Sequence, residues 1–301
     1  MEEIPATHKS VLLHELIDSL AIAAGDTVID MTAGGGGHAR AAAERLENGT
    51  LIGLDQDEKA LERVRARLKG VSAEVCLVQA NFRDVDQALA ECGKTEAQRV
   101  YFDLGLSSNQ LDESGRGFSF LRDEPLLMTF AHDPRDAPRT AWEIVNEWRE
   151  ERIAEILFTY GEERYARRIA RAIREAREGQ SIERTSDLVR IIEEAVPVSY
   201  KHQGIHPATR TFQALRIAAN EEIESLEEGL DKAIEILTPG GRIGVISFHS
   251  LEDRIVKHHF LEWEKSDRGV RITKKPIVPS EEERRENPRA RSAKLRVFQT
   301  H

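Results

Sequence analysis

Cysteine is scarce in this sequence, and its scarcity excludes two classes of protein. The 301 residues include two cysteines, Cys76 and Cys92, which are too few for the disulfide framework of a small secreted domain. Their spacing also differs from that of zinc ligands. We therefore expect both cysteines to be reduced thiols with a structural role.

The sequence also lacks an apolar run of membrane-spanning length, and its first residues, MEEIP, do not form a secretory signal. We therefore expect no membrane partner and a cytoplasmic location. Hydrophobic residues make up 40% of the chain and charged residues 32%, which is typical of a globular protein and not of a disordered one. The length suits one large domain or two ordinary ones.

A positive net charge is missing as well, since the formal net charge is -10 at pH 7. This balance argues against indiscriminate binding of nucleic acid. Basic residues are nevertheless concentrated between positions 284 and 296, where six Lys or Arg face one glutamate, Glu286. Five arginines between 164 and 174 recur at helical spacing; either they form a basic stripe or they pair with neighbouring glutamates on a solvated face.

The most informative segment is residues 30–38, DMTAGGGGH, which follow an apolar run and precede a helix-favouring stretch. A strand that ends in an acid and continues through glycines into a helix lets backbone N–H groups approach a ligand closely. Residues 51–55 form a second strand pattern that ends in Asp55, where a carboxylate can accept hydrogen bonds from ribose hydroxyls. This pattern predicts a nucleotide-type cofactor site.

Both NAD and S-adenosylmethionine (SAM) are compatible with that pattern, and the first loop distinguishes them. Asp30 stands four residues ahead of Gly34. Its carboxylate would repel a pyrophosphate, whereas it could reach an amino or hydroxyl group. SAM has no phosphate and carries a cationic aminoacyl tail, so the loop favours SAM over NAD.

Strand and helix patterns alternate in the way that a parallel sheet requires. We predict strands over 27–31, 51–55, 74–79, 99–105 and 242–247, helices over 58–69 and 212–237, and two late strands over 269–278 and 294–299. Between about 140 and 196 the pattern is helical throughout. We therefore expect an α/β fold, a Rossmann-like class I SAM-dependent methyltransferase sheet built from 1–139 and 206–301, with an inserted all-helical substrate-recognition domain over 140–205.

Six segments closely resemble the RsmH (MraW) family, whose members are 16S ribosomal RNA (cytosine-N4)-methyltransferases. They are residues 103–112 (DLGLSSNQLD), 116–120 (RGFSF), 160–164 (YGEER), 206–216 (HPATRTFQALR), 247–254 (SFHSLEDR) and 287–292 (NPRARS). The resemblance extends from His8 to the C-terminus. It implies that SAM is the cofactor and that 16S rRNA of the small ribosomal subunit is the partner and substrate.

The resemblance also implies which residues bind the cofactor. The matching positions are Gly36, Gly37 and His38 for the glycine loop, Asp55 for the ribose, Phe82 for adenine stacking, and Asp103 and Gln110 near the methionine moiety. From the residues alone, core packing would be the simpler explanation of Phe82.

The implied reaction places acceptors near the exocyclic N4 of cytidine, whose lone pair is delocalised into the ring. The enzyme must hold this nitrogen in line with the methyl group and accept its hydrogens as the bond forms. Our catalytic candidates are Asp103, Ser107 and Ser108. Turn capping explains the two serines equally well, and Asp103 could instead bind the cofactor.

The target base must be unstacked and held on an apolar surface. Phe118 and Phe120 could provide that surface, although they are equally well explained as a hydrophobic staple for their loop. Arg289 and Arg291 are the candidates for contacts with RNA phosphates.

One segment departs from the family. Where the family commonly reads GPLDMRM, residues 124–130 read EPLLMTF, so that Leu127 and Thr129 replace an acid and an arginine. Asp123 or Glu124 would then have to serve as the substitute acceptor. Two alternatives therefore stay open: methylation of another nucleic-acid base, or a catalytically impaired SAM-binding factor in ribosome assembly.

The histidines do not predict a metal site. His202 and His206 are four residues apart, but Gly204 and Pro207 place them on a loop. His249, beyond the strand at 242–247, suggests a role on the substrate side or in the structure. The sequence leaves the oligomeric state open, and a homodimer is compatible with it.

Overall fold

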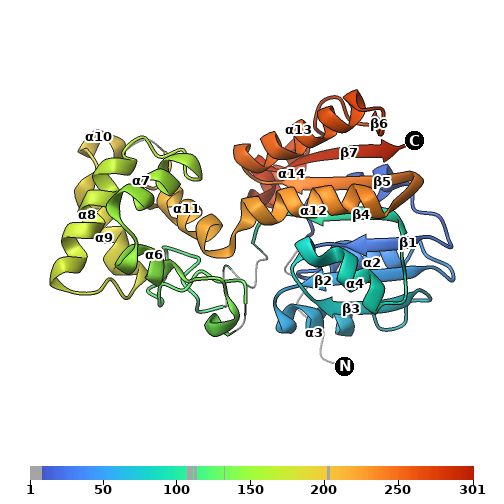
Figure 1. Ribbon diagram of the computed structural model, residues 1–301, viewed down its shortest axis with the longest axis horizontal. Coiled ribbons are helices and arrows are strands. Elements are labelled where there is room, and N and C mark those ends of the chain that lie inside the picture. The colour runs from blue at the N-terminus through green and yellow to red at the C-terminus, as the bar shows by residue number, and fades with distance from the viewer. Residues whose placement is uncertain (1–8, 107–110, 112–113, 132, 202–203) are drawn as a thin grey trace. The chain divides into compact units, whose positions relative to one another are not determined.

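The computed structural model describes residues 9–106, 111, 114–131, 133–201 and 204–301, and the chain divides into two compact units (Figure 1). The first unit combines Met1–Ser107 with Glu224–His301, and the second is Ser108–Ile223. The second unit contains the predicted helical range 140–205 and extends beyond it on both sides. It does so because the chain before α6 bonds to these helices, as in the bridge between Pro125 and Arg184.

The first unit is built on one seven-stranded sheet in the order β3-β2-β1-β4-β5-β7-β6. Its strands are β1 (Thr27–Asp30), β2 (Thr50–Asp55), β3 (Glu74–Gln79), β4 (Ala97–Asp103), β5 (Leu237–Ser247), β6 (Gly269–Arg271) and β7 (Lys294–Thr300). The pairs among β1 to β5 are parallel, whereas β7 is antiparallel to both β5 and β6. The predicted Rossmann-like α/β sheet with a final antiparallel pair is confirmed.

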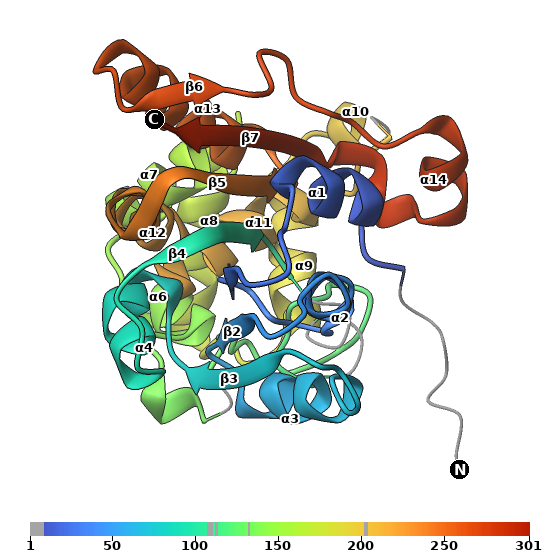
Figure 2. The same ribbon diagram turned by 90° about the vertical axis from the view of Figure 1, so that its right-hand side faces the viewer.

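Helices cover both faces of this sheet (Figure 2). One face packs against α1 (Leu13–Leu20), α2 (Gly37–Ala43) and α3 (Glu58–Arg67), and the other against α4 (Val85–Glu91), α12 (Glu222–Ile236) and α13 (Ser250–Lys265). Val28 and Ile29 are both fully buried, on opposite faces of β1. This burial on both sides explains why the central strands read as continuous apolar runs. The remaining short helices of this unit are η1 (Phe82–Asp84), α14 (Glu281–Glu286) and η3 (Pro288–Ser292).

The second unit is helical in its described part. Its elements are η2 (Pro134–Asp136), α6 (Ala141–Glu147), α7 (Glu150–Thr159), α8 (Ala166–Gly179), α9 (Thr185–Ala195), α10 (Val198–Lys201) and α11 (Ala208–Asn220). A capping box starts α6: Thr140 accepts from the backbone N–H of Glu143, and the Glu143 side chain accepts from that of Thr140. Among the described helices of the whole chain, none is both long and apolar enough to cross a membrane.

Two predicted elements differ from the structure. The helix expected over 212–237 is divided between α11 and α12, because Glu221 adopts a left-handed conformation with φ 51°. The Asn220 side chain, which accepts from the N–H of Phe130 and donates to the carbonyl of Met128, anchors the chain at this break. The strand expected over 269–278 is limited to Gly269–Arg271, with an isolated bridge from Ile277 to Leu295.

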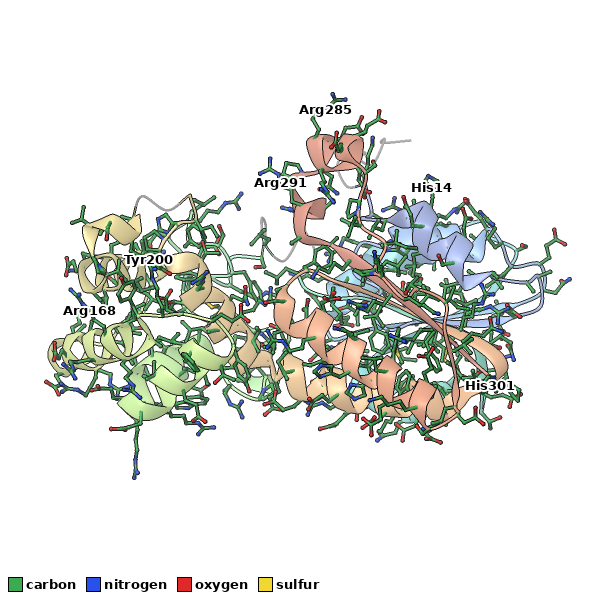
Figure 3. All side chains as sticks on the ribbon, turned by 90° about the horizontal axis from the view of Figure 1, so that it is seen from above. His14, Arg168, Tyr200, Arg285, Arg291 and His301 are labelled. Carbon is green, nitrogen blue, oxygen red and sulfur yellow. A yellow bond between two sulfur atoms is a disulfide. The ribbon has the colours of Figure 1, made fainter. Side chains whose placement is uncertain are left out.

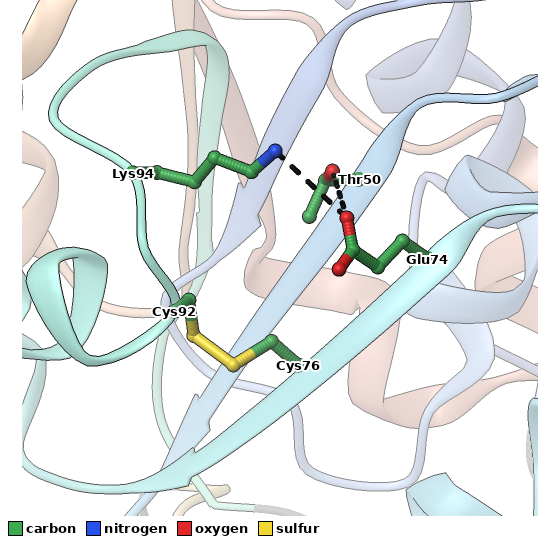
Figure 4. Close-up of a disulfide and its surroundings, with 5 residues drawn as sticks. All are labelled: Thr50, Glu74, Cys76, Cys92 and Lys94. Atoms are coloured by element: carbon green, nitrogen blue, oxygen red, sulfur yellow. Dashed lines mark hydrogen bonds and ion pairs between the residues drawn. A yellow bond between two sulfur atoms is a disulfide. The ribbon is translucent and has the colours of Figure 1, made fainter.

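The prediction of two reduced thiols is wrong for this structure, because Cys76 and Cys92 form a disulfide (Figure 4). Cys76 lies on β3 and Cys92 ends α4, and their Cα atoms are 6.1 Å apart. Both side chains are half-buried against the core. The sheet and the helix bring the two sulfurs together, so a spacing of 16 residues in the sequence could not reveal the pairing.

Candidate active site

Three acids meet at one edge of the sheet, as the sequence predicts. Asp30, Asp55 and Asp103 are the last residues of β1, β2 and β4, which are parallel neighbours. The chain leaves β1 toward β2 on one side and later returns to β4 on the other. Such a switch point is where open α/β sheets bind ligands, at the carboxyl ends of the strands.

The glycine loop after β1 is fastened to the acid of β2. The N–H of Gly34 donates to Asp55 Oδ2 at 2.8 Å, and the N–H of Asp57 donates to Asp55 Oδ1 at 2.9 Å. Burial raises the pKa of Asp55, while these two backbone donors oppose that rise. Each carboxylate oxygen can accept a further hydrogen bond, so Asp55 both braces the loop and remains able to bind a hydroxyl.

The next glycines lie where side chains would not fit. Gly36 precedes α2 with φ 73°, in the left-handed region that favours glycine. A Cβ on Gly37 would lie 1.9 Å from the Oγ of Ser10. The N-terminal segment therefore passes directly against the start of α2, and a side chain on Gly37 would displace the Ser10 hydroxyl.

His38 forms an ion pair with Asp103 beside this crossing. Its Nδ1 lies 3.2 Å from Asp103 Oδ2, and its Nε2 lies 3.0 Å from the carbonyl oxygen of Val11. Burial lowers the pKa of His38, but the Asp103 carboxylate outweighs it, and the net pKa is raised. A carboxylate and a carbonyl can only accept hydrogen bonds, so this geometry favours the doubly protonated form of the His38 ring.

A second buried network lies beneath this pair. Tyr101 donates its hydroxyl to Asp30 Oδ2 at 2.7 Å, and Asp30 Oδ1 accepts from the N–H of Thr32 at 3.0 Å. The Thr32 hydroxyl oxygen then accepts from the N–H of Asp103 at 2.7 Å. Burial raises the pKa of Asp30 to about 7, although the bond from Tyr101 opposes the rise. Asp30 thus supports the loop from within and is withdrawn from solvent.

Asp103 keeps one oxygen without a hydrogen-bond partner among the described residues. Its Oδ1 is buried, whereas its Oδ2 pairs with His38. A buried carboxylate oxygen without a donor is costly unless a ligand supplies one. The geometry therefore leaves one acceptor for an amino or hydroxyl group at the end of β4.

Phe82 is placed at the edge of the core. It is half-buried, and its ring meets that of Phe102 edge to face, with centroids 5.4 Å apart. A Cβ on Gly229 of α12 would lie 2.8 Å from the Phe82 ring, so that glycine makes room for it. Packing thus accounts for part of the ring, and adenine stacking stays a prediction. Ser107, Ser108 and Gln110, the other predicted residues, lie outside the described part of the chain.

The predicted base-holding phenylalanines both lie in the second unit and have different surroundings. Phe118 is 6% exposed, stacked on Phe130 and covered by the Arg116 guanidinium at 5.6 Å. Phe120 is half-buried and stacks on the ring of His206, with centroids 4.6 Å apart. Phe118 therefore packs as a hydrophobic staple of its loop, and Phe120 is the more accessible aromatic ring.

The segment that departs from the family is engaged in local contacts. Thr129 is fully buried and Leu127 half-buried. Asp123 pairs with Arg184 at 2.6 Å, and the Glu124 carboxylate accepts from the N–H of Gly117 at 2.9 Å. Both proposed substitute acceptors thus have structural partners in the second unit.

Arg289 and Arg291 lie on η3, directly after α14, in the first unit. Arg291 is exposed, and Figure 3 shows Arg285 and Arg291 extending away from the ribbon. On α8, by contrast, Arg174 pairs with Glu150, Glu175 and Glu178. Part of the predicted basic stripe is therefore neutralised. Lys294 and Arg296 also pair with an acid, Asp253, so η3 is the stronger candidate for binding phosphate.

The histidines outside the glycine loop have structural contacts. His249 caps α13, where its Nδ1 accepts from the N–H of Glu252 at 3.3 Å. Across the described residues, no group of three or more His, Cys, Asp or Glu could hold a metal ion. His202 lies outside the described residues.

Sequence reasoning missed several residues that shape the site: Ser10, Val11, Thr32 and Tyr101. The acid and threonine two residues apart at 30 and 32 are a recognisable signal, because an Asp side chain often accepts from the N–H two residues on. Nothing in the sequence signals the contribution of Val11, which acts through its backbone carbonyl.

Known proteins similar to this chain cover nearly all of it. A model of the MraW methylase family matches residues 5–301. A protein of Brevibacillus brevis named ribosomal RNA small subunit methyltransferase H is 45% identical over 306 residues, which cover 96% of each chain. Among solved structures, an rRNA methylase from Streptococcus thermophilus shows 11% identity and a TM-score of 0.47 over 97% of this chain and 98% of that one. A putative methyltransferase from Streptococcus mutans in complex with SAH shows 11% identity and a TM-score of 0.45 over 98% and 100%. On the family match and the identity to its curated relative, this chain belongs to the MraW methylase family.

Proposed function

We propose that this protein transfers a methyl group from SAM to the exocyclic N4 of a cytidine in 16S rRNA of the small ribosomal subunit. The observation that carries the proposal is the edge of the sheet where Asp30, Asp55 and Asp103 converge around a glycine loop. Membership of the MraW methylase family and the name of the 45% identical relative support the same reaction and substrate.

The residues at this edge fit SAM. Asp55 would accept from the ribose hydroxyls, whereas the Cβ positions of Gly36 and Gly37 face Val64 and Ser10 of the protein itself. Carboxylates favour a cationic aminoacyl group and disfavour a pyrophosphate. Phe82 and Gln110 would hold the adenine and methionine ends. When bound, SAM supplies an electrophilic methyl group.

The protein's own contribution to the reaction is to position acceptors. Asp103 holds Oδ1 free of partners in the described structure, while His38 neutralises and orients its other oxygen. An acceptor in this place would bind the N4 amine or the amino group of the donor, and it would stabilise charge that develops as the methyl group is transferred. Ser107 and Ser108 remain the candidates for a second acceptor.

We infer RNA-binding roles for residues of each unit, taken by itself. The methyltransferase domain would comprise 1–139 and 206–301, with 140–205 as the inserted recognition domain. Phe118 and Phe120 are the candidates for holding the extruded base, of which Phe120 is the more accessible, and Arg289 and Arg291 would bind RNA phosphates. A cytoplasmic location follows from this substrate, and a homodimer is compatible with it.

The test is methyl transfer from labelled SAM to isolated small ribosomal subunits, followed by nucleoside analysis. We expect N4-methylcytidine. Detection of another modified base would show that the target is a different base, while SAM would remain the methyl donor. SAM binding without transfer would favour the impaired assembly factor, for which the buried, unpartnered Thr129 hydroxyl is the supporting observation among the described residues.

A further inference from the structure

Residues 9–12, which we call the N-terminal strap, connect two segments that are far apart in the sequence. On one side the strap meets the glycine loop: the Ser10 Oγ occupies the space beside Gly37, and the Val11 carbonyl lies 3.0 Å from His38 Nε2. Val11 is 7% exposed, so this contact is shielded from water. The strap therefore determines where the His38 ring sits.

On its other side the strap is held by the C-terminal part of the chain. The N–H of Leu12 donates to Glu283 Oε1 at 2.8 Å, and Asn287 Nδ2 donates to the carbonyl of Lys9 at 3.1 Å. Glu283 lies on α14, 271 residues from Leu12. An ion pair from Lys9 to Glu286 at 2.5 Å completes this side.

These contacts differ in strength. The side chains of Lys9 and Glu286 are 76% and 43% exposed, so their ion pair contributes little. The bond from Leu12 to Glu283 is partly buried and has a charged acceptor, which makes it the stronger contact. It also holds a strained residue, because Leu12 has φ 52° in the left-handed region, which a leucine rarely adopts. Glu283 therefore makes the strongest polar contact of the strap, beside the buried side chains of Val11 and Leu12.

We propose that Glu283 is a positioning residue for the methyl-transfer site. Three contacts form the path: Glu283 holds the N–H of Leu12, the adjacent Val11 carbonyl holds His38 Nε2, and His38 Nδ1 holds Asp103 Oδ2. Without Glu283 the strap can leave the left-handed turn at Leu12. His38 then loses its carbonyl partner, and the Asp103 carboxylate is no longer held in one orientation.

The inference rests on the proposed function only for the identity of the methyl donor. Its test is the binding of S-adenosylhomocysteine, measured by calorimetry. We expect Glu283→Ala to weaken binding about tenfold, because a hydrogen bond to a charged acceptor is worth about this much when its effect is transmitted. Glu283→Gln keeps an oxygen for the Leu12 N–H and should recover most of the affinity. Glu281→Ala, a neighbouring change of equal charge at an exposed position of α14, should bind like the wild type.

A second measurement separates positioning from a general loss of stability. Nitrogen-15 NMR of the His38 ring should show both nitrogens protonated in the wild type and in Glu283→Gln, and altered ring shifts in Glu283→Ala. In a His38→Ala background, Glu283→Ala should cause no further loss of affinity, since the path is already broken. If Glu283→Ala does not fold, Glu283→Asp replaces it, because a carboxylate one methylene shorter cannot keep the 2.8 Å bond to Leu12.

Three results would overturn the inference: unchanged affinity in Glu283→Ala, unchanged His38 ring shifts, or the same loss of affinity with His38 already removed. These outcomes are distinct from failure of the proposed function. That failure would appear in the wild type, as absence of binding to S-adenosylhomocysteine before any substitution is made.

Discussion

The two units of the chain hold their candidate site residues in different ways. In the first unit the residues are polar or charged, buried and linked to one another, as in the ion pair between His38 and Asp103 and the bond from Tyr101 to Asp30. In the second unit they are aromatic, and the nearby acids are occupied by local partners, as Asp123 is by Arg184. The departure from the family at 127 and 129 also falls in the second unit.

This difference separates two kinds of chemistry. Binding a cationic donor requires fixed negative charge at a preorganised edge, and the first unit provides it. Holding an extruded base requires an apolar face, for which Phe120 is suited. Substitutions of the acids Asp55 and Asp103 should therefore affect methyl-donor binding and transfer, whereas substitutions of Phe120, Arg289 and Arg291 should affect RNA binding.

The largest effect is expected from Asp103→Asn. The amide cannot keep the ion pair with the His38 imidazolium and offers one acceptor oxygen in place of two. We expect kcat/KM for methyl transfer to fall by about 10²–10³, the usual cost of losing a preorganised charge-stabilising group. The initial rate at subunit concentrations well below KM measures it, and a variant with more than half of the wild-type value would remove Asp103 from the reaction.

The next largest effect concerns the disulfide, which lies away from the acidic edge. Reduction of Cys76–Cys92 should lower the free energy of unfolding by about 3 kcal/mol, the loop-closure value for a loop of this length. Urea denaturation with and without reductant measures the change. The matched control is the Cys76→Ser and Cys92→Ser double variant, whose stability should not respond to reductant.

Asp55→Asn tests the residues that are expected to bind the methyl donor. The substitution leaves one carbonyl oxygen to serve both the Gly34 and Asp57 N–H groups, and the ribose hydroxyls lose a charged acceptor. We expect affinity for S-adenosylhomocysteine to fall by about 10- to 100-fold, while affinity for RNA stays unchanged. An equal loss of both affinities would show that the two kinds of binding are not separable.

Arg289→Ala and Arg291→Ala test the substrate side. Each substitution should weaken RNA binding and reduce the slope of log affinity against log salt by about 1, because one fewer phosphate contact releases fewer counterions. Donor affinity should not change. Filter binding at several salt concentrations measures the slope, and slopes equal to that of the wild type would exclude both residues from the interface.

The last test concerns the pH dependence of stability, through Asp30. Its carboxyl titrates near 3.8 when unfolded and at about 7 when folded. The folded state therefore binds more protons in this range, and the stability contributed by neutral Asp30 is lost as pH rises through 7. Asp30→Asn should flatten the fall in unfolding free energy between about pH 4 and 7; a fall as steep as in the wild type would contradict this assignment.

The sheet could be predicted from sequence because its strands leave a strong local signal. Continuous apolar runs such as that ending at Asp30 occur where both faces are buried, and the acids that end them mark one edge. The helix break at Glu221 could not be predicted in this way, because it depends on Asn220 contacting residues some 90 positions earlier. The disulfide escaped prediction for the same reason, since β3 and α4 must fold before their cysteines meet.

The sequence by itself determined the kind of site: a glycine loop between β1 and α2, an acid at the end of each neighbouring strand, and the family to which the segments belong. These features are local, so the order of residues along the chain is enough to express them. The tertiary structure alone decided how the acids work. Asp103 is oriented by His38, His38 by the Val11 carbonyl, and the strap that carries Val11 by Glu283. Each of these contacts joins segments distant in sequence. The partner of a backbone carbonyl, moreover, cannot be predicted from the type of residue that carries it.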